Sequence, residues 1–368
     1  METKNKNIRY MDRPEDYKKL GVNPNKIELW EDGRRDNDDP GHWEWWYFDA
    51  LMDDGTAVII QFLEKSFQTI NDSVGHPFIN FQITMPDGKH YEEMVPCSID
   101  DRKLGKDKCD VHHGANYFVG DFKNYHIHVE PYNGIAADIH LKSLTQPFRP
   151  GSAYLSADEK DEEYYTWLCS VPKGEVMGSL TVEGKRFEVH GFGYHDHQWG
   201  SINYMTLWNH WTWARHNFED YSLLVFDMTS SKSYGFKHFP ITFIEDKDGN
   251  IIFENTKSES CSCEVLEEYR DEVSGKDYPK VTKYIFNYGS KKVQYLLKEN
   301  EILQNVAAYE MAPETQRAIY DKIGMKPSYT RYRATGELMI YEEGKDTIER
   351  KGELIYEFMY PGISYKNK

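Results

Sequence analysis

The densest group of side chains that can exchange protons lies in the segment Gly191-Phe-Gly-Tyr-His-Asp-His-Gln-Trp-Gly200. Its three glycines leave the backbone free to bend or to approach another segment closely. Side chains alternate between two faces in a β-strand. The alternation predicts one face with His195, His197 and Trp199, and the other with Tyr194, Asp196 and Gln198.

Three interpretations of this segment stay open. His-x-His on a strand is a metal-ligand spacing, and a third nitrogen could come from His190, His210 or His216. Alternatively, Asp196 and the histidines form a proton-handling group beside aromatic side chains. In the structural interpretation, buried polar side chains form a hydrogen-bonded corner between two domains. We rank metal binding last and predict no metal site.

A second acid lies among aromatic residues in His42-Trp-Glu-Trp-Trp-Tyr-Phe-Asp49. Alternation predicts one face with Trp43, Trp45 and Tyr47, and the other with Glu44, Trp46 and Phe48. Desolvation raises a carboxyl pKa, which could keep Glu44 protonated near neutrality as a general acid must be. The structural alternative is that Glu44 pairs with an arginine and the tryptophans belong to the core.

A third candidate acid, Asp227, ends an apolar row in a predicted hairpin. The segments 207–215 and 221–227 form its two strands, with the turn at 217–220. Alternation predicts Trp211 and Trp213 on one face, opposite His210 and Thr212.

The elements that position these residues are predicted to be strands. Aromatic residues make up 15% of the chain, and they favour β-structure. Turn signals such as Asp53-Asp-Gly55 and Pro86-Asp-Gly88 separate apolar runs and indicate hairpins. We predict strands at 42–52, 56–64, 78–84, 116–122, 125–131, 134–143, 165–171, 174–182, 186–194, 208–215, 221–229, 234–243, 251–254, 280–288, 292–300, 333–341 and 352–360. This spacing favours all-β sandwiches or barrels, with short helices at 14–20 and 312–323.

A chain of 368 residues is long for one core and favours two domains. The weakest connection is 201–207. We therefore predict an N-terminal extension at 1–40, an N-terminal β-domain at 41–203 and a C-terminal β-domain at 204–368.

The net charge and the absence of several motifs argue against some classes of partner and enzyme. A net charge of −17 argues against nucleic acid, whose phosphates need clustered Lys and Arg. The five cysteines favour free thiols in a reducing compartment, and no apolar run predicts membrane insertion, so we expect a cytoplasmic protein. The sequence lacks a phosphate loop, a G-x-S-x-G elbow and His-Glu-x-x-His, which argues against nucleotide-dependent enzymes and common hydrolases. It does not indicate an oligomeric state.

Three motifs in order, Glu44-Trp-Trp-Tyr47, the stretch 167–178 and Gly193–Gly200, give the chain a family resemblance. It resembles the carotenoid 1,2-hydratase (hydroxyneurosporene synthase) and AttH-like family, whose relatives include fungal kievitone hydratases and the lipocalin-like Diels–Alderases of decalin biosynthesis. The Trp211-x-Trp213 pair and the closing segment 352–357 also fit. The likeness spans about 38–360.

The resemblance implies two lipocalin-like β-barrel or sandwich domains and a hydrophobic ligand cavity. Family members add water to an isolated isoprenoid double bond, or fold a polyene for cyclisation, without a redox cofactor. His197 and Trp199 look like the hydratases' functional His and Trp. Asp227 is similar to their downstream acid, but the tripeptide here is Val225-Phe-Asp227, without the tyrosine of the family's Tyr-x-Asp pattern.

Taken together, these observations predict a cofactor-independent lyase or hydratase. It would add water to, or remove it from, a C=C bond of a hydrophobic isoprenoid-type or polyphenolic substrate by acid catalysis. The predicted catalytic residues are Asp196, Asp227, His197, His195, Tyr194 and Glu44. The predicted substrate-binding residues are Trp45, Trp46, Trp199, Trp211, Trp213 and Tyr47. The alternatives are a pericyclase or isomerase, and a non-enzymatic lipocalin-like carrier of a hydrophobic ligand.

Overall fold

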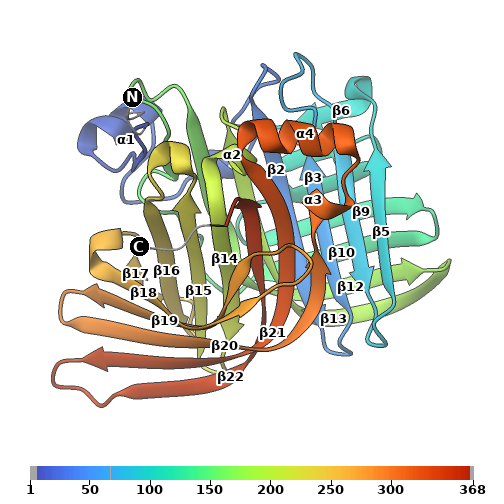
Figure 1. Ribbon diagram of the computed structural model, residues 1–368. Coiled ribbons are helices and arrows are strands. Elements are labelled where there is room, and N and C mark those ends of the chain that lie inside the picture. The colour runs from blue at the N-terminus through green and yellow to red at the C-terminus, as the bar shows by residue number, and fades with distance from the viewer. Residues whose placement is uncertain (1–5, 67, 365–368) are drawn as a thin grey trace. The chain divides into compact units, whose positions relative to one another are not determined.

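The computed structural model describes residues 6–66 and 68–364, which form mainly antiparallel β-structure (Figure 1). Contacts within the chain define two compact units, one of Asn7–Asn203 and one that runs from Tyr204 onward and includes Lys6. Each unit has its own curled sheet with few short helices. The predicted all-β fold class is therefore confirmed, and the domains 41–203 and 204–368 stay our proposal.

The first unit is built on a sheet of 13 strands. They are β1 (Arg9–Tyr10), β2 (Trp43–Met52), β3 (Ala57–Leu63), β4 (Phe78–Thr84), β5 (His90–Pro96), β6 (Arg102–Leu104), β7 (Asp110–His113), β8 (Asn116–Gly120), β9 (Asn124–Tyr132), β10 (Ile135–Ser143), β11 (Tyr154–Ser156), β12 (Tyr164–Val182) and β13 (Lys185–Gly200). Their order is β5-β4-β3-β2-β13-β12-β10-β9-β8-β7-β6, with β11 also beside β12 and β1 beside β11. The helical elements are α1 (Pro14–Leu20), η1 (Leu29–Asp32) and η2 (Ile99–Asp101).

Strict alternation builds the core of the first unit. In β4, Ile79, Phe81 and Ile83 are fully buried, whereas Asn80 and Gln82 between them are half-buried. A period of two is what a strand with one face on a core requires. The same pattern sends Trp46 and Phe48 of β2 into this core.

The second unit is built on a sheet of nine strands. They are β14 (Trp208–Asn217), β15 (Tyr221–Ser230), β16 (His238–Asp246), β17 (Ile251–Asn255), β18 (Cys261–Arg270), β19 (Asp277–Tyr288), β20 (Lys291–Val306), β21 (Met325–Glu342) and β22 (Ile348–Gly362). Their order is β17-β16-β15-β14-β22-β21-β20-β19-β18. The helical elements are α2 (Tyr204–Leu207), η3 (Lys232–Tyr234), η4 (Ser258–Ser260), α3 (Ala308–Met311) and α4 (Glu314–Ile323).

Several strand predictions were wrong in extent. The segments 165–171 and 174–182 are one strand, β12, whose pairing with β13 absorbs the irregularity as register shifts between Cys169 and Gly174. The predictions missed β5 and β18. Their side chains are mostly exposed or half-buried, so neither strand shows a regular apolar alternation. An edge strand without a buried face leaves little hydrophobic signal.

The two predicted helices are present. The first spans Pro14–Leu20 as predicted, with proline in its first turn. The second begins at Glu314 rather than 312, because Pro313 has extended backbone (φ −58°, ψ 156°) and serves as its N-cap. It ends at Gly324, whose φ of 72° lies in the left-handed region that favours glycine.

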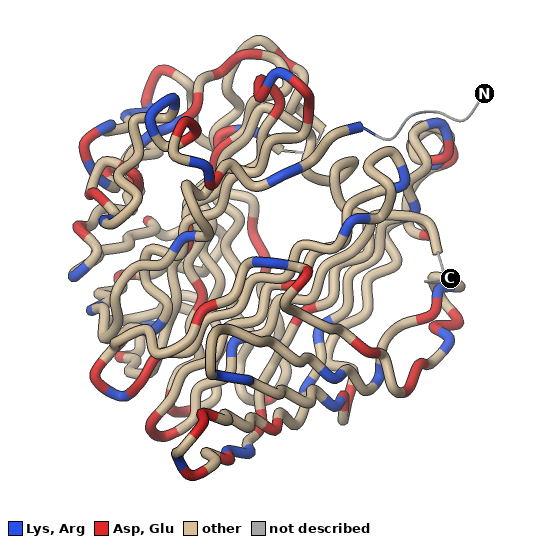
Figure 2. The backbone as a smooth tube through the Cα atoms, turned by 90° about the vertical axis from the view of Figure 1, so that its left-hand side faces the viewer, with Lys and Arg blue, Asp and Glu red and all other residues tan. Residues whose placement is uncertain are grey.

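Charged residues of both signs share the same turns and strands. Figure 2 shows Lys and Arg interleaved with Asp and Glu along the chain. Within the described ranges, no helix has the length and apolar composition that a membrane crossing requires.

The glycines of the segment 191–200 provide close approach between strands. A Cβ at Gly191 would lie 2.4 Å from the carbonyl oxygen of Leu51 and 2.6 Å from Cα of Met52 in β2. At Gly200, a Cβ would lie 2.6 Å from the carbonyl oxygen of Tyr164 in β12. These contacts are with backbone, which cannot move aside as a flexible side chain can. The segment is the C-terminal part of β13, and its glycines allow this close pairing.

We predict that Gly191→Ala destabilises the first unit by about 3 kcal/mol, because the added methyl meets fixed backbone on β2. Gly88→Ala is the control: it has open space around it but a φ of 85°, and should cost about 1 kcal/mol of backbone strain. Urea unfolding followed by tryptophan fluorescence measures both. Equal costs for the two variants would contradict the close-approach explanation.

Candidate functional site

Strand β13 lies between β2 and β12 and presents its two faces as predicted. His195 and His197 are fully buried on the face that points to the core of the first unit, and Trp199 follows them. The opposite face presents Tyr194, Asp196 and Gln198, which bond to one another. One strand thus separates two groups of titratable side chains.

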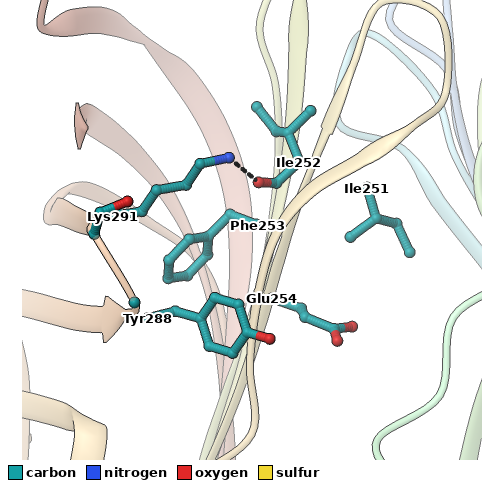
Figure 3. A pocket seen from close by; sticks show the side chains of 8 residues that line it. Ile251, Ile252, Phe253, Glu254, Tyr288 and Lys291 are labelled. Carbon is teal, nitrogen blue, oxygen red and sulfur yellow. Dashed lines mark hydrogen bonds between the residues drawn. The ribbon is translucent and has the colours of Figure 1, made fainter. Parts of the chain in front are cut away.

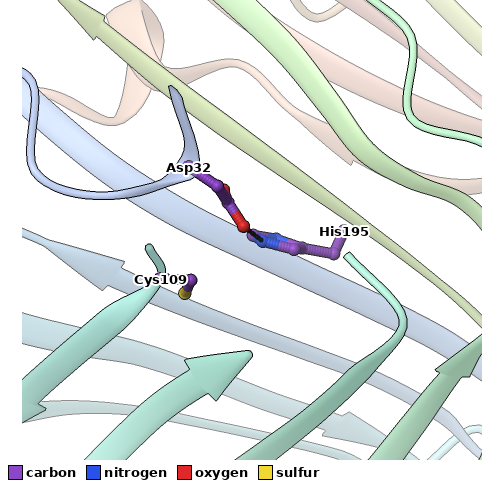
Figure 4. A group of neighbouring side chains, drawn as sticks. All are labelled: Asp32, Cys109 and His195. Atoms are coloured by element: carbon purple, nitrogen blue, oxygen red, sulfur yellow. Dashed lines mark hydrogen bonds and ion pairs between the residues drawn. The ribbon is translucent and has the colours of Figure 1, made fainter. Parts of the chain in front are cut away.

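His195 is held between two oxygen acceptors, of which Figure 4 shows the Asp32 carboxylate. Its Nδ1 lies 2.9 Å from the carbonyl oxygen of Tyr47, and its Nε2 lies 3.2 Å from Oδ2 of Asp32. A carbonyl can only accept, so Nδ1 is the donor. The bond at Nε2 then requires one further proton, on the imidazole or on Asp32. The two contacts fix the ring between the carbonyl oxygen and the carboxylate.

His197 repeats the arrangement with a second carboxylate. Its Nε2 lies 2.8 Å from Oε1 of Glu44, and its Nδ1 lies 3.2 Å from the carbonyl oxygen of Glu31. Glu44 also accepts the backbone N–H groups of Arg35 (2.7 Å) and Asp36 (3.3 Å). The partners of Glu44 are therefore an imidazole and two backbone N–H groups, in place of the arginine side chain suggested by the structural alternative.

The His197 ring is flanked by aromatic faces. Trp46 stacks on it with centroids 4.6 Å apart and an interplanar angle of 12°, and Trp199 lies 4.5 Å away. The two indole rings pack against this fully buried imidazole. Trp46 and Trp199, both predicted to bind substrate, thus pack against the buried His197 ring.

Asp32 is the residue on which the core network converges. Burial alone would raise its pKa, but His195, His197 and the Tyr125 hydroxyl together hold the pKa below its ordinary range. Tyr125 donates to Oδ2 at 2.6 Å, and Ser170 donates to Oδ1 at 2.8 Å. Sequence reasoning missed Asp32, because we predicted its segment as an extension. Its signal was weak: two acids, Glu31-Asp32, directly after the apolar pair Leu29-Trp30.

Asp32, Cys109 and His195 form a compact group whose ligand atoms lie within 4.8 Å of one another (Figure 4). The geometry could hold a metal ion, but the hydrogen bonds favour a packed core. The Cys109 thiol donates to the carbonyl oxygen of Phe118 at 3.3 Å. Burial, and then the charge of Asp32, raise its pKa well above the ordinary value. Metal binding needs the thiolate.

The hydrogen bonds of Asp196 are made with residues other than His195 and His197. Its Oδ2 accepts from the Tyr194 hydroxyl (2.9 Å) and from Nε1 of Trp167 (3.2 Å), and the Gln198 amide donates to both oxygens. Burial raises the pKa of Asp196 to about 6, even though these hydrogen bonds lower it. A proton-handling group of Asp196 with His195 and His197 is thus not assembled, and Asp196 has its own aromatic surroundings.

Asp36 is a further candidate that sequence reasoning missed. Burial raises its pKa to about 6, against the hydrogen bond from Nδ1 of His42 at 2.5 Å. Tyr164 donates to the same oxygen, Oδ1, at 3.2 Å. The other oxygen, Oδ2, is buried and accepts no hydrogen bond from any residue that the structure describes. A carboxyl with a free buried oxygen can hold its proton there.

An aromatic cluster connects Asp36 to the end of β13. The rings of Tyr164 and Tyr154 lie 5.2 Å apart, and Trp199 donates from Nε1 to the Tyr154 hydroxyl at 3.2 Å. Asp36 also donates its backbone N–H to Glu44, the partner of His197. The neighbourhood thus joins a protonatable carboxyl to the predicted residues His197 and Trp199.

Asp227 belongs to the second unit and is ion-paired there. Strand pairing sets it opposite Thr212 on the core face of β15, so Trp211 and Trp213 lie on the other face of β14. Burial would raise the pKa of Asp227, but contact with Nε2 of His238 lowers it. Burial lowers the pKa of His210 nearby to about 4, which keeps that ring neutral.

The predicted site residues therefore fall into three groups. His195, His197, Glu44, Trp46 and Trp199 share the core face of β2 and β13. Tyr194, Asp196, Trp45 and Tyr47 lie on the opposite face. Asp227, Trp211 and Trp213 belong to the second unit. Among the suggested third metal ligands, His190 faces away from His195 and His197 and bonds to Asp53, and His210 and His216 belong to the second unit.

An open depression of about 450 Å³ lies in the second unit, between β17 and the turn from β19 to β20 (Figure 3). Tyr288 is 61% exposed beside Phe253, and Lys291 donates from Nζ to the carbonyl oxygen of Ile252 at 2.8 Å. None of the predicted site residues lines it. The depression has one acid, Glu254, whose pKa burial raises.

Family comparison agrees with the sequence resemblance. A family model described as AttH-like matches residues 91–312. The chain belongs to the AttH-like family. A curated relative, Diels-Alderase ucsH from Acremonium sp., is 23% identical over 255 residues. That match spans 62% of this AttH-like chain and 61% of the relative's length.

Solved structures share the fold. A putative AttH from Nitrosomonas europaea has a TM-score of 0.59 at 15% identity, covering 92% of this chain and 98% of that one. CghA with Sch210972 has a TM-score of 0.57 at 12% identity and 88% and 89% coverage. Kievitone hydratase from Nectria haematococca has a TM-score of 0.54 at 13% identity and 92% and 93% coverage.

We predict that Asp32→Asn destabilises the first unit by about 3 to 5 kcal/mol, because the change removes the carboxylate that pairs with the buried imidazole of His195. The midpoint of urea unfolding measures the loss. Asp53→Asn is the matched control, because Asp53 pairs with His190 at 2.6 Å on the surface and should leave the midpoint nearly unchanged. Similar midpoints for the two variants would contradict an essential buried pair.

The Asp227–His238 pair should contribute to the free energy of unfolding only within a range of pH. The lowered pKa of Asp227 contributes stability above its ordinary value of 3.8, which is lost as pH falls through the folded pKa. The pKa of His238 is raised: burial lowers it, but Asp227 raises it more. The contribution of His238 is full below its ordinary value of 6.5 and is lost as pH rises through the folded pKa.

We therefore expect His238→Gln to cost about 2 kcal/mol between these pH values and progressively less on either side. Urea midpoints of wild type and variant across this range give the difference. A difference that does not change with pH would show that His238 stabilises only by packing.

Proposed function

We propose that this AttH-like protein is an enzyme that converts a hydrophobic small molecule without a cofactor, and that it adds water to, or removes it from, a C=C bond of an isoprenoid-type or polyphenolic substrate. The supporting observation is a buried carboxyl, Asp36, with a pKa of about 6 and one oxygen that accepts no hydrogen bond from the described part of the chain. The name of kievitone hydratase, a relative by fold, is consistent with this chemistry.

In the proposed hydration, Asp36 transfers its proton to one alkene carbon, and the π electrons form the new C–H bond. The cation on the other carbon is stabilised by the faces of Trp199 and the neighbouring tyrosines. Water attacks the cation, and its surplus proton returns to the Asp36 carboxylate. The sum is one water added and the acid regenerated. A carboxyl pKa near the working pH suits both steps.

The other predicted acids take different parts in this proposal. Asp196 is the alternative donor, because burial also raises its pKa to about 6, although three donors already occupy its oxygens. Asp227 is less suited to donate a proton, since His238 stabilises its ionised form. His195, His197 and Glu44 act as positioning residues, and Tyr194 orients Asp196.

A pericyclase is the second candidate. The observation in its favour is the curated relative named a Diels-Alderase. Such a reaction needs a shaped aromatic surface and little acid chemistry, so Trp45, Tyr47, Trp211 and Trp213 would contribute by packing against the substrate.

The test uses purified full-length chain with kievitone and a panel of isoprenoid alkenes, in ordinary and in ¹⁸O-labelled water. A hydratase yields products heavier by one water that contain the label. We expect Asp36→Asn to lower kcat by about two orders of magnitude or more with KM little changed. Activity should fall as pH rises above about 6, because the donor must be protonated.

Asp72→Asn, an exposed carboxyl paired with His76, is the control and should retain full activity. Isomerised product without label, insensitive to Asp36→Asn, would favour the pericyclase. Binding without conversion would favour a carrier. If Asp36→Asn, Asp196→Asn and Asp227→Asn all keep wild-type turnover of an identified substrate, acid catalysis is wrong.

A further inference from the structure

The outer face of β9 and β10 presents a group of histidines that the proposed function does not use. Ile127, Val129, Ile139 and Leu141 of these strands are buried in the core of the first unit. Alternation therefore directs the intervening residues outward. These are His126, His128, Asp138 and His140.

Antiparallel pairing of β9 and β10 brings the four side chains next to one another. His126 is directly opposite His140, and His128 is directly opposite Asp138. Side chains opposite one another in such a pair have Cβ atoms about 5 Å apart, close enough for a shared ligand. The ligand atoms of His126, Asp138 and His140 lie within 4.8 Å of one another.

The contacts inside the group suit a cation. Nε2 of His126 lies 2.6 Å from Oδ1 of Asp138, and the rings of His126 and His140 are stacked with centroids 4.2 Å apart. Nδ1 of His128 lies 3.9 Å from the other oxygen, Oδ2, and has no hydrogen-bond partner among the residues that the structure describes. Tyr117 on β8 packs against both His126 and His128.

We propose that His126, Asp138 and His140 form a binding site for a divalent transition-metal ion of the zinc type. Two imidazoles and a carboxylate are a ligand set that zinc prefers, and a water can complete the tetrahedron. Ligand atoms about 2.1 Å from a tetrahedral zinc ion lie about 3.4 Å from each other. Side-chain rotations that move the ligand atoms by about 1 Å therefore bring them to this spacing. His140 is exposed and can make this movement.

The site stands apart from the proposed catalysis. It lies on the opposite face of the sheet from the core network of His195 and His197. Zinc binding should join β9 to β10 and stabilise the first unit by mass action. Occupancy should not affect turnover through Asp36.

The test is titration of the chelator-treated full chain with Zn²⁺, followed by calorimetry and by thermal unfolding. We expect one zinc ion per chain and a Tm that rises with zinc concentration. His140→Ala and Asp138→Asn should each weaken binding by at least about tenfold and remove most of the Tm rise. Cu²⁺ should bind more tightly than Zn²⁺, because affinity for such ligands increases in that order.

His90→Ala is the matched control, since His90 is a surface histidine on β5 that contacts Thr84 and belongs to no such group within the described ranges. It should bind zinc as the wild type does. The proposal is overturned if the wild type takes up no zinc at micromolar concentrations, or if His140→Ala and Asp138→Asn both bind as tightly as the wild type. The Tm of each variant without zinc verifies that it is folded.

Discussion

Two buried imidazole–carboxylate pairs, His195 with Asp32 and His197 with Glu44, are the constraint on which the first unit depends. A single charge in this core would be very costly, so each group is tolerated only with its partner. The second nitrogen of each ring donates to a backbone carbonyl, which fixes both rings. The contacts of His195 with Asp32 and of His197 with the Glu31 carbonyl therefore attach η1 to β13, more than 150 positions later in the chain. The ion pair of Glu31 with Arg149 at 2.7 Å attaches η1 to the loop before β11 as well.

Four buried aspartates differ in pKa because their surroundings differ. Partners lower the pKa values of Asp32 and Asp227 against the effect of burial, so both stay ionised. Burial dominates at Asp36 and Asp196, and their pKa values rise to about 6. Carboxyls whose pKa values are pushed apart in this way commonly divide into structural or electrostatic roles and proton-transfer roles. This division is the physical basis for preferring Asp36 and Asp196 as donors.

How much the sequence could predict follows from the range of each interaction. Alternation within one strand predicted β4 and the two faces of β13, because both depend only on neighbouring residues. The partners of His195 and His197 could not be predicted, since Asp32 and Glu44 come from distant segments and no local pattern indicates them. Asp36 could not be predicted for the same reason, because its raised pKa arises from folding, which buries it beside His42 and Tyr164.

The core pairs and the proposed acid are also connected to each other. Glu44 accepts the backbone N–H of Asp36, and its negative charge is one of the causes that raise the pKa of the Asp36 carboxyl. Nε2 of His197 lies 2.8 Å from Oε1 of Glu44, and this contact holds the Glu44 side chain in place. It therefore also fixes the position from which the charge of Glu44 acts on Asp36. Under the proposed function, His197 acts at a distance from the substrate: it positions Glu44, and Glu44 helps raise the pKa of the proton donor Asp36.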